Sequence, residues 1–428
     1  MTTAGATPAG TTLPEAITGD PALRRVLAAL APARALIVGG AVRNALLGEP
    51  VSDIDIATDA RPELVMERAA AAGLKPVPTG IDHGTVTVVA DGRGFEVTSF
   101  RRDVATDGRR AEVAFSDRLE DDASRRDFTI NALYADAEGE VIDPVGGLAD
   151  LAARRLRFVG DPDQRIAEDY LRILRFFRFH AWYGRKGGAD PAALAACARH
   201  AAGLARISRE RIGAEMRKLL SAPDPVEAVA LMQAAGVLAQ LLPGADAARL
   251  SALEAVALDG AAGPGRCPRA AAAAFLPENS PPDCFPGARK PRDISGQKMD
   301  WQLRLAALGA EDAAGALRLS RAEARVQEEL HSTLPLDEAA YRLGEARAVQ
   351  LALLRASRGE GLPADWRERI GFAAAQVLPI SAADLAGRLS GPALGRGLKA
   401  AEVAWIGSGF RLPAAALVDV ALQAGDGT

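Results

Sequence analysis

The chain has 428 residues, of which 49% are hydrophobic and 25% charged, so it is long enough for about two to four packed units. Its formal net charge of -4 excludes the overall basic field of a protein that holds nucleic acid mainly by charge, so any nucleic-acid site must be a local basic patch. The three cysteines lie far apart, and no apolar stretch reaches the roughly 20 residues that span a bilayer, so we expect a cytoplasmic protein without disulfides, a zinc knuckle or a membrane partner.

The first part of the chain is predicted to contain a sheet and the rest to be helical. Between Leu36 and Ile142, short β-branched runs alternate with helical patterns, whereas from Leu148 onward alanine, leucine and arginine recur at helical spacing. We therefore predict an α+β fold, with a flexible N-terminus at 1–22, a mixed α/β region at 23–147 and helical regions at 148–222 and 223–428. Proline- and glycine-rich stretches at 260–268 and 277–291 indicate a long loop or a domain junction.

The segment ALIVGGAVRNALLG at residues 35–48 predicts a strand, a turn at Gly39 and Gly40, and a short helix that ends at Gly48. Glycines let backbone N–H groups approach an anion closely, and the start of a helix adds a positive dipole. Arg43, one turn into the helix, can reach a phosphate. The pattern indicates a phosphate cradle, and a strand, turn and helix without a ligand is the alternative.

Two carboxylates follow in the next predicted strand. Alternation with period two buries Ile54 and Ile56 and places Asp53 and Asp55 on the opposite face. Two like charges this close repel unless a cation lies between them, and Mg²⁺ prefers carboxylate oxygens. The pair therefore favours a divalent metal site, with a solvated strand face as the alternative.

Glu96 is the candidate for the third carboxylate that a two-metal site needs. It lies on the second arm of a predicted hairpin whose first arm is Thr85 to Ala90 and whose turn contains Asp91 and Gly92. The alternative is a surface glutamate on an edge strand.

A polar, charged segment at residues 101–115 follows this hairpin. Charged residues surround a glycine in it, which is typical of a mobile loop. A solvent-exposed hairpin loop is the alternative. The residues at the centre of the predicted loop are Asp103, Asp107, Gly108 and Arg109.

A helix predicted at residues 168–178 carries Asp169 and Arg172, which are three residues apart and so share a face. A carboxylate can accept from the exocyclic amine of cytosine or adenine while a guanidinium donates to the adjacent ring nitrogen, and guanine and uracil present the opposite polarity. The pair could therefore select C and A without a template. Arg175 and Arg178 continue the face toward phosphate or a base edge, and a solvated helix with ion pairs is the alternative.

At residues 125–132 the sequence RRDFTINA predicts a charged cluster entering an apolar helix, and this pattern resembles the class II tRNA nucleotidyltransferases. The resemblance extends to GGAVR at 39–43, DIDIAT at 53–58 and EDYLRILR at 168–175, in the family's order along the chain. It implies a nucleotidyltransferase head of the polymerase β type with a small mixed sheet, followed by an all-helical neck, body and tail.

The resemblance also implies an activity and partners. Enzymes of this family add CCA to the 3′ end of tRNA from CTP and ATP, without a template and with release of pyrophosphate. We therefore expect tRNA, CTP and ATP as partners, no DNA, and a two-metal Mg²⁺ site. A poly(A) polymerase that acts on RNA 3′ ends and a non-catalytic RNA-binding relative are the alternatives.

Roles for single residues follow from the same resemblance. The implied metal ligands and catalytic residues are Asp53, Asp55 and Glu96. The residues implied to bind the nucleotide are Gly39, Gly40 and Arg43 at the triphosphate, Arg126 and Asp127 at the nucleotide and its ribose, and Asp169 and Arg172 at the base. Arg175 and Arg178, on the same helix face, are expected to bind the nucleotide at phosphate or at the base edge. The segment at 101–115 is implied to be a flexible lever for the change from C to A addition.

The resemblance covers residues 36–220, about half of the chain. A helix predicted at 207–220, with Ser208 as its N-cap, resembles the last conserved block and is expected to give structural support. The chain departs from the family at Asn44, where an aspartate is usual, so the ion pair of that aspartate is lost or replaced. Tail helices that bind tRNA are implied for the remainder by analogy alone.

Overall fold

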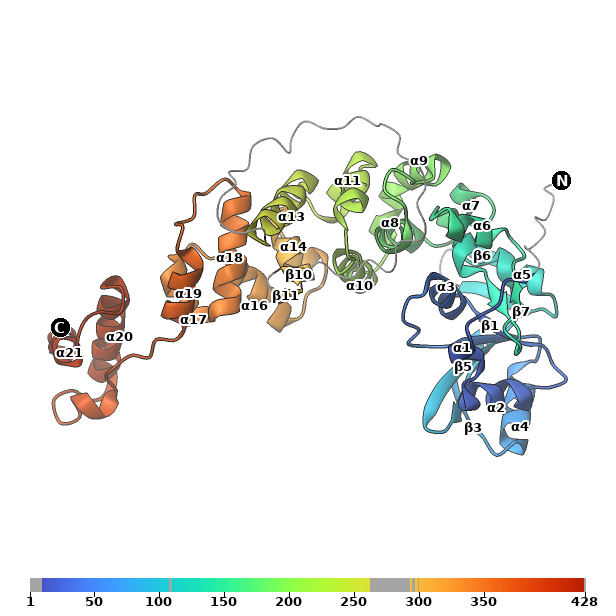
Figure 1. Ribbon diagram of the computed structural model, residues 1–428, viewed down its shortest axis with the longest axis horizontal. Helices are drawn as coiled ribbons and strands as arrows, with labels where there is room; N and C mark the ends of the chain where they lie inside the picture. The colour runs from blue at the N-terminus through green and yellow to red at the C-terminus, as the bar shows by residue number, and fades with distance from the viewer. Residues whose placement is uncertain (1–9, 108–109, 262–292, 295–296, 299, 427–428) are drawn as a thin grey trace. The chain divides into compact units, whose positions relative to one another are not determined.

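The computed structural model describes residues 10–107, 110–261, 293–294, 297–298 and 300–426 (Figure 1). Contacts between residues divide the described chain into two units. The first contains residues 10–245 and 316–318, and the second contains the other described residues from 246 onward. The divisions predicted at 147 and 222 both lie inside the first unit.

The first unit is built on a seven-stranded mixed sheet, as the sequence predicts. Only β2 and β5 run parallel; every other neighbouring pair in the sheet is antiparallel. The strand order is β3-β4-β5-β2-β1-β8-β9. The strands are β1 (Ala35–Val38), β2 (Asp55–Thr58), β3 (Lys75–Gly80), β4 (Thr85–Ala90), β5 (Arg93–Ser99), β8 (Tyr134–Ala135) and β9 (Val141–Ile142).

The β4–β5 hairpin is confirmed in its arms and in its turn. Asp91 and Gly92 have φ angles of 50° and 77°, so both turn residues are left-handed, as a two-residue hairpin turn of type I′ requires. Alternate residues of β4 are buried, which fixes the register of the pair. Because β5 pairs with β2 on its other side, Glu96 is not on an edge strand, and the edge-strand alternative is wrong.

Short helices cover the sheet and complete its core. The side chains of Leu119 and Ala123 pack with Leu36, Phe100 and Tyr134 in one buried cluster. The helices of this region are α1 (Glu15–Thr18), α2 (Pro21–Ala29), α3 (Gly40–Leu47), α4 (Pro62–Ala71) and α5 (Leu119–Ser124), with single 3₁₀ turns at η1 (Ile81–His83) and η2 (Thr129–Asn131).

Residues 10–22, which we expected to belong to a flexible N-terminus, have defined structure. Thr12 forms a β-bridge with Glu140, and Leu13 is buried. The side chain of Asp20 accepts a hydrogen bond from the Ala22 N–H at 2.9 Å and so caps α2. The N-terminal segment is therefore part of the first unit from at least Thr12 onward.

The segment predicted as a mobile loop forms an antiparallel hairpin of β6 (Arg101–Asp107) and β7 (Arg110–Phe115), with a shift of register between Asp103 and Ala105. Asp103 pairs with Val113 and Asp107 with Arg110 in its register. Gly108 and Arg109 lie outside the described residues. The movement of this hairpin stays a prediction.

The residue ranges predicted for two helices differ from those in the structure. Residues 125–132 do not form a helix, because α5 ends at Ser124 and the chain is extended at Phe128 before the η2 turn. The helix predicted at 168–178 is interrupted at Asp169, which has an extended backbone (φ -151°, ψ 105°). Its carboxylate accepts from the Leu171 N–H at 3.1 Å, a local bond that starts a new helix instead of continuing the old one.

The rest of the first unit is helical. Ser208 caps α10, as predicted, by accepting from the Arg211 N–H at 3.4 Å. Asp161 and Asp190, each followed by proline, cap two other helices in the same way. The helices are α6 (Gly147–Ala152), α7 (Pro162–Glu168), α8 (Leu171–Tyr183), α9 (Pro191–Arg199), η3 (Ala201–Arg206), α10 (Arg209–Leu220), α11 (Val226–Ala234) and α12 (Val237–Leu241).

The second unit is nearly all helical, and the exception is a pair of two-residue strands, β10 (Asp293–Ile294) and β11 (Gln297–Lys298). A buried ion pair between Arg304 and Glu254, 2.8 Å apart, joins two of its helices. The helices are α13 (Ala247–Ala261), α14 (Trp301–Leu308), α15 (Ala313–Ala316), α16 (Arg321–Leu330), α17 (Leu336–Leu343), α18 (Glu345–Ser357), α19 (Trp366–Ala374), η4 (Ala382–Leu385), α20 (Gly391–Gly407) and α21 (Ala414–Asp426).

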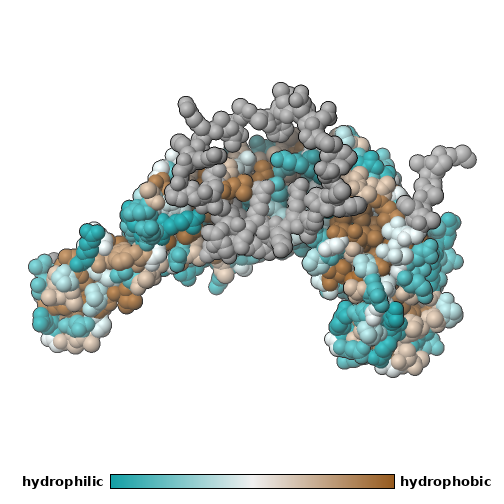
Figure 2. Space-filling model, viewed as in Figure 1, coloured by the Kyte–Doolittle hydropathy of each residue, from teal (hydrophilic) through white to brown (hydrophobic). Residues whose placement is uncertain are grey.

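Hydrophobic residues also reach the surface of the second unit. Phe372, Val377 and Val403 are exposed, and Figure 2 shows apolar residues among the hydrophilic ones over this part of the chain. Among the described residues, no helix is both long and apolar enough to cross a membrane. The proline-rich stretch at 277–291 lies outside the described residues.

Candidate active site

The predicted carboxylates lie where three neighbouring strands line up. Asp55 is the register partner of Glu96 on the parallel neighbour β5 and of Val38 on the antiparallel neighbour β1. Val38 is the residue before Gly39. The glycine turn, Asp55 and Glu96 are therefore brought together by strand pairing alone.

The alternation predicted around the two aspartates is confirmed. Ile54 and Ile56 are buried, whereas Asp53 and Asp55 are exposed. Asp53 precedes β2, and its carboxylate accepts from the Ser52 hydroxyl at 2.9 Å. Strand pairing thus places Asp55 and Glu96, while Asp53 lies on the adjoining segment.

The electrostatics of these acids favour a cation. Loss of surrounding water raises the pKa of Asp55, and the negative charges of Glu96 and Asp53 raise it further, while Arg126 opposes them. In the described part of the chain, no group of three or more His, Cys, Asp or Glu side chains is yet arranged to hold a metal ion. The Asp55–Glu96 pair fits one side of a Mg²⁺ site, and Asp53 would have to turn toward it.

The glycine turn has the predicted strand, turn and helix geometry. Gly39 has φ 69° and ψ -119°, a backbone conformation that favours glycine, and α3 begins at the next residue. A Cβ atom at Gly39 would lie 3.4 Å from Nη1 of Arg126 and 3.5 Å from the Asn131 carbonyl oxygen. The turn therefore packs closely against the segment that carries Arg126.

Arg43 is buried, and its guanidinium is surrounded by neutral hydrogen-bond acceptors. It donates to Oδ1 of Asn44 at 2.8 Å, to Oδ1 of Asn131 at 2.5 Å and to the Tyr183 hydroxyl at 2.9 Å. Burial lowers the pKa of Arg43, and the nearby Arg178 guanidinium adds to the effect. Asn44 thus replaces the ion pair expected of an aspartate with a neutral contact, so none of these three partners cancels the charge of Arg43.

Asp122 fixes the orientation of Arg126 and was missed by the sequence analysis. Its side chain is 1% exposed and accepts from Arg126 at 2.9 Å, from Arg125 at 2.7 Å and from the Tyr134 hydroxyl at 2.8 Å. Burial alone would raise the pKa of Asp122, but Arg126 and Arg125 hold it below its ordinary value. The signal was available in the sequence, because Asp122 precedes these arginines by three and four residues at the end of a helix.

Asp127 joins this segment to α8. It accepts from Nε of Arg175 at 2.7 Å, from Nδ2 of Asn131 at 3.0 Å and from the Phe128 N–H at 2.8 Å. Burial alone would raise the pKa of Asp127, but the Arg175 guanidinium holds it low. Two of the residues predicted to bind the nucleotide, Asp127 and Arg175, are therefore paired with each other.

Asp169 and Arg172, the predicted acceptor and donor for a base, each have an ion-pair partner of their own. Nη1 of Arg172 donates to Glu168 at 2.5 Å, whereas Asp169 accepts from Arg211 of α10 at 2.7 Å. Glu168, four residues before Arg172, is a partner that the sequence pattern did not predict.

Arg178, the last of the predicted α8 residues, pairs with Glu215 of α10 at 2.6 Å. Its guanidinium carbon lies 4.1 Å from the centre of the Phe179 ring, which Arg43 and Arg175 also approach at 5.2 Å and 5.3 Å. Three guanidinium groups therefore lie close to one aromatic ring, and two of them, those of Arg175 and Arg178, are paired with carboxylates.

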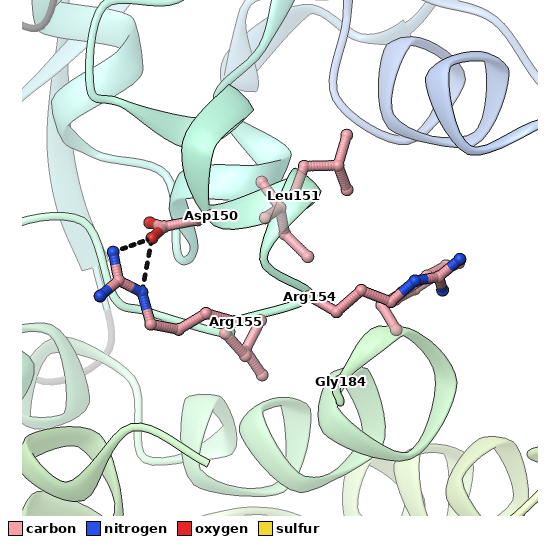
Figure 3. A pocket seen from close by; sticks show the side chains of 8 residues that line it. Asp150, Leu151, Arg154, Arg155 and Gly184 are labelled. Carbon is pink, nitrogen blue, oxygen red and sulfur yellow. Dashed lines mark hydrogen bonds and ion pairs between the residues drawn. The ribbon is translucent and has the colours of Figure 1, made fainter. Parts of the chain in front are cut away.

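A shallow surface hollow lies at the C-terminal end of α8 (Figure 3). The buried carboxylate of Asp150 accepts from Nε of Arg155 at 2.7 Å on its wall, and Arg154 and Gly184 also line it. None of the residues predicted for catalysis or nucleotide binding lines this hollow. The hollow is therefore separate from the predicted catalytic and nucleotide-binding site.

We predict that Asp122→Asn lowers the free energy of unfolding by about 1–3 kcal/mol near neutral pH, because two guanidinium groups lose a buried carboxylate. The folded state holds the pKa of Asp122 below its ordinary value of 3.8, so its contribution is complete above that value and is lost as the pH falls through the folded-state pKa. Urea unfolding at several pH values should therefore show the deficit of the variant shrinking below about pH 4.

Glu120→Gln is the matched control, because it makes the same charge change at an exposed position on α5. We expect it to change stability by less than about 0.5 kcal/mol. A deficit for Asp122→Asn equal to that of the control, or one that does not shrink in acid, would contradict the assigned ion pairs.

Comparison with known protein families gives two matches to this chain. A family model described as the poly A polymerase head domain matches residues 35–157. A second, described as a probable RNA and SrmB-binding site of polymerase A, matches residues 190–249. The first match contains the three carboxylates and the glycine turn.

The chain is also similar to named proteins and to a solved structure. The human protein named CCA tRNA nucleotidyltransferase 1, mitochondrial, is 47% identical over 189 residues, 43% of each chain, so the chain spans less than half the length of that relative. The CCA-adding enzyme of Geobacillus stearothermophilus is 35% identical over 349 residues, 78% of this chain and 77% of that protein. A crystal structure described as the Bacillus stearothermophilus CCA-adding enzyme in complex with CTP aligns with a TM-score of 0.65 at 30% identity, covering 90% of this chain and 92% of the other. The chain therefore belongs to the family of class II CCA-adding enzymes and poly(A) polymerases.

Proposed function

We propose that this protein adds CCA to the 3′ end of tRNA without a template, taking nucleotides from CTP and ATP and releasing pyrophosphate. The observation that carries the proposal is the strand register that places Asp55 beside Glu96 and next to the Gly39–Gly40 turn. Paired carboxylates beside a glycine turn are what transfer of a nucleotide from a triphosphate requires.

The likeness to named enzymes supports the choice of reaction. Relatives from human mitochondria and from Geobacillus are named as CCA-adding enzymes, and the aligned Bacillus structure is described with CTP. The RNA-binding family match at residues 190–249 supports an RNA substrate held by the helices that follow α8. A poly(A) polymerase is the second candidate, because both matching family models are named for that enzyme.

In the proposed reaction, the 3′ hydroxyl of the RNA attacks the α-phosphate of CTP or ATP in line with the leaving pyrophosphate. Asp53, Asp55 and Glu96 would hold two Mg²⁺ ions, which supply charge stabilisation for the attacking and leaving oxygens. Backbone N–H groups at the Gly39–Gly40 turn bind the triphosphate. Arg126, held by the buried Asp122, contacts the nucleotide from a fixed position.

Base selection is proposed for Asp169 and Arg172 at the start of α8. Both are ion-paired, Asp169 with Arg211 and Arg172 with Glu168. A cytosine or adenine that bonds to them would exchange these pairs for base contacts, and guanine or uracil would present donors and acceptors of the wrong polarity. The ion pairs thus restrict both side chains to the start of α8.

We propose that the predicted regions of the chain have different functions. The head at 23–147 carries the chemistry, the neck at 148–222 selects the base, and the body and tail at 223–428 bind tRNA. We also propose a cytoplasmic location.

The direct test is incubation of the purified protein and Mg²⁺ with tRNA that lacks its 3′ CCA, with CTP and ATP supplied singly and together, followed by sequencing of the products. We expect ordered addition of two C and one A. Long A tracts without C would favour the poly(A) polymerase. Addition of C alone would indicate that the β6–β7 hairpin does not make the change from C to A addition. No addition would overturn the proposed function in favour of a non-catalytic relative.

A double substitution tests the proposed metal ligands. Asp53→Ala with Asp55→Ala should lower the rate of nucleotide addition by at least about 10³-fold, because metal stabilisation supplies several kcal/mol. Binding of tRNA, followed by fluorescence polarisation, should be unchanged. Glu63→Ala with Glu67→Ala, two exposed positions on α4, makes the same charge change and should leave the rate within about twofold. Substantial activity in the Asp53 and Asp55 variant would refute the assignment.

A further inference from the structure

Asn131 lies between two charged groups of the site and is only 7% exposed. Its Oδ1 accepts from Nη1 of Arg43 at 2.5 Å, and its Nδ2 donates to Oδ1 of Asp127 at 3.0 Å. A guanidinium can only donate and a carboxylate can only accept, so a single orientation of the amide satisfies both neighbours. The amide is therefore fixed at both ends.

Each neighbour of Asn131 is in turn bonded to α8. Asp127 accepts from Nε of Arg175 at 2.7 Å. Arg43 donates to the Tyr183 hydroxyl at 2.9 Å, and its guanidinium carbon lies 4.1 Å from the centre of the Tyr183 ring. Because Arg175 and Tyr183 belong to the same helix, the contacts form a closed ring that contains Asn131.

The amide also keeps two opposite charges apart. Arg43 and Asp127 are both buried, and opposite charges in a low dielectric attract strongly. Without a group between them, the two side chains would tend to pair directly. Such a pair would draw Arg43 away from a bound phosphate and Asp127 away from Arg175.

We propose that Asn131 is a positioning residue, which couples the triphosphate-binding turn around Gly39 and Arg43 to the nucleotide-binding arginines of α8. The roles of these two regions rest on the proposed function, whereas the mechanical link between Arg43 and Arg175 does not. Asn131 touches neither substrate nor metal in this account, and acts through Arg43 and Asp127.

Steady-state kinetics of CTP and ATP addition test the proposal. Asn131→Ala should raise KM for both nucleotides by at least about tenfold, with a smaller change in kcat, because a hydrogen bond to a charged group is lost on each side. Thr129→Val is the control, since it removes a buried hydrogen bond to Asp150 within the same η2 turn but touches neither Arg43 nor Asp127. Its KM should stay within about twofold of the wild-type value.

The pH dependence of Asn131→Asp gives a readout that a purely structural role would not move. The new carboxylate would face Asp127 and repel it, whereas its protonated form has an O–H that can donate as Nδ2 of Asn131 does. The ratio of variant to wild-type kcat/KM should therefore rise at least about threefold as the pH falls from about 8 to about 6. The charged and titratable groups that surround this position are Arg43, Arg126, Asp127, Arg175, Arg178 and Tyr183.

Amide hydrogen exchange separates this inference from the proposed function, because it needs no substrate. In the full chain, Arg175→Lys should lower the protection of the α3 amides by at least about threefold, and Asn131→Ala should remove this remote effect. The proposed coupling would be overturned if Arg175→Lys left the protection of the α3 amides unchanged. It would also be overturned if the loss of protection persisted after Asn131→Ala. An unchanged KM for Asn131→Ala, a flat pH ratio for Asn131→Asp, or a Thr129→Val variant that behaves as Asn131→Ala does would overturn it as well.

Discussion

The ion pair between the buried carboxylate of Asp127 and the partly buried guanidinium of Arg175 is the interaction on which the packing of α8 against the site depends. It ties the segment after α5 to α8, and so holds residues from two distant stretches of the chain in one place. Burial of the Asp127 carboxylate costs desolvation, which is offset here by further bonds from Asn131 and from the Phe128 N–H to the same carboxylate. Asn131 also connects this carboxylate to Arg43.

Backbone pairing positions the acids, and side-chain pairing positions the cations. Asp55 and Glu96 are neighbours because β2 and β5 are parallel, so their separation follows from sheet geometry. Arg126 and Arg175, in contrast, are held by the buried carboxylates of Asp122 and Asp127. In the proposed function, the neighbouring acids on the sheet and the ion-paired arginines would together receive a metal-bound triphosphate.

Local sequence signals predicted the parts of the fold that depend on neighbours in the chain. The Asp91–Gly92 turn and the Gly39–Gly40 turn are specified by backbone conformations that few residues adopt, and both were predicted correctly. The break at Asp169 was missed because periodicity assumes an unbroken helix, whereas one side-chain bond to the Leu171 N–H ends it. The partners of Arg43 could not be predicted, because Asn131 and Tyr183 lie 88 and 140 residues away along the chain.

The central claim is that Asp55 and Glu96 hold a catalytic divalent metal next to the nucleotide. Crystals of the protein grown with CTP and Mn²⁺ would test it directly through anomalous diffraction. The account predicts an anomalous peak between these two carboxylates, in contact with the triphosphate of CTP and with Asp53 turned toward it. Bound CTP at the Gly39–Gly40 turn with no metal peak between Asp55 and Glu96 would contradict the account.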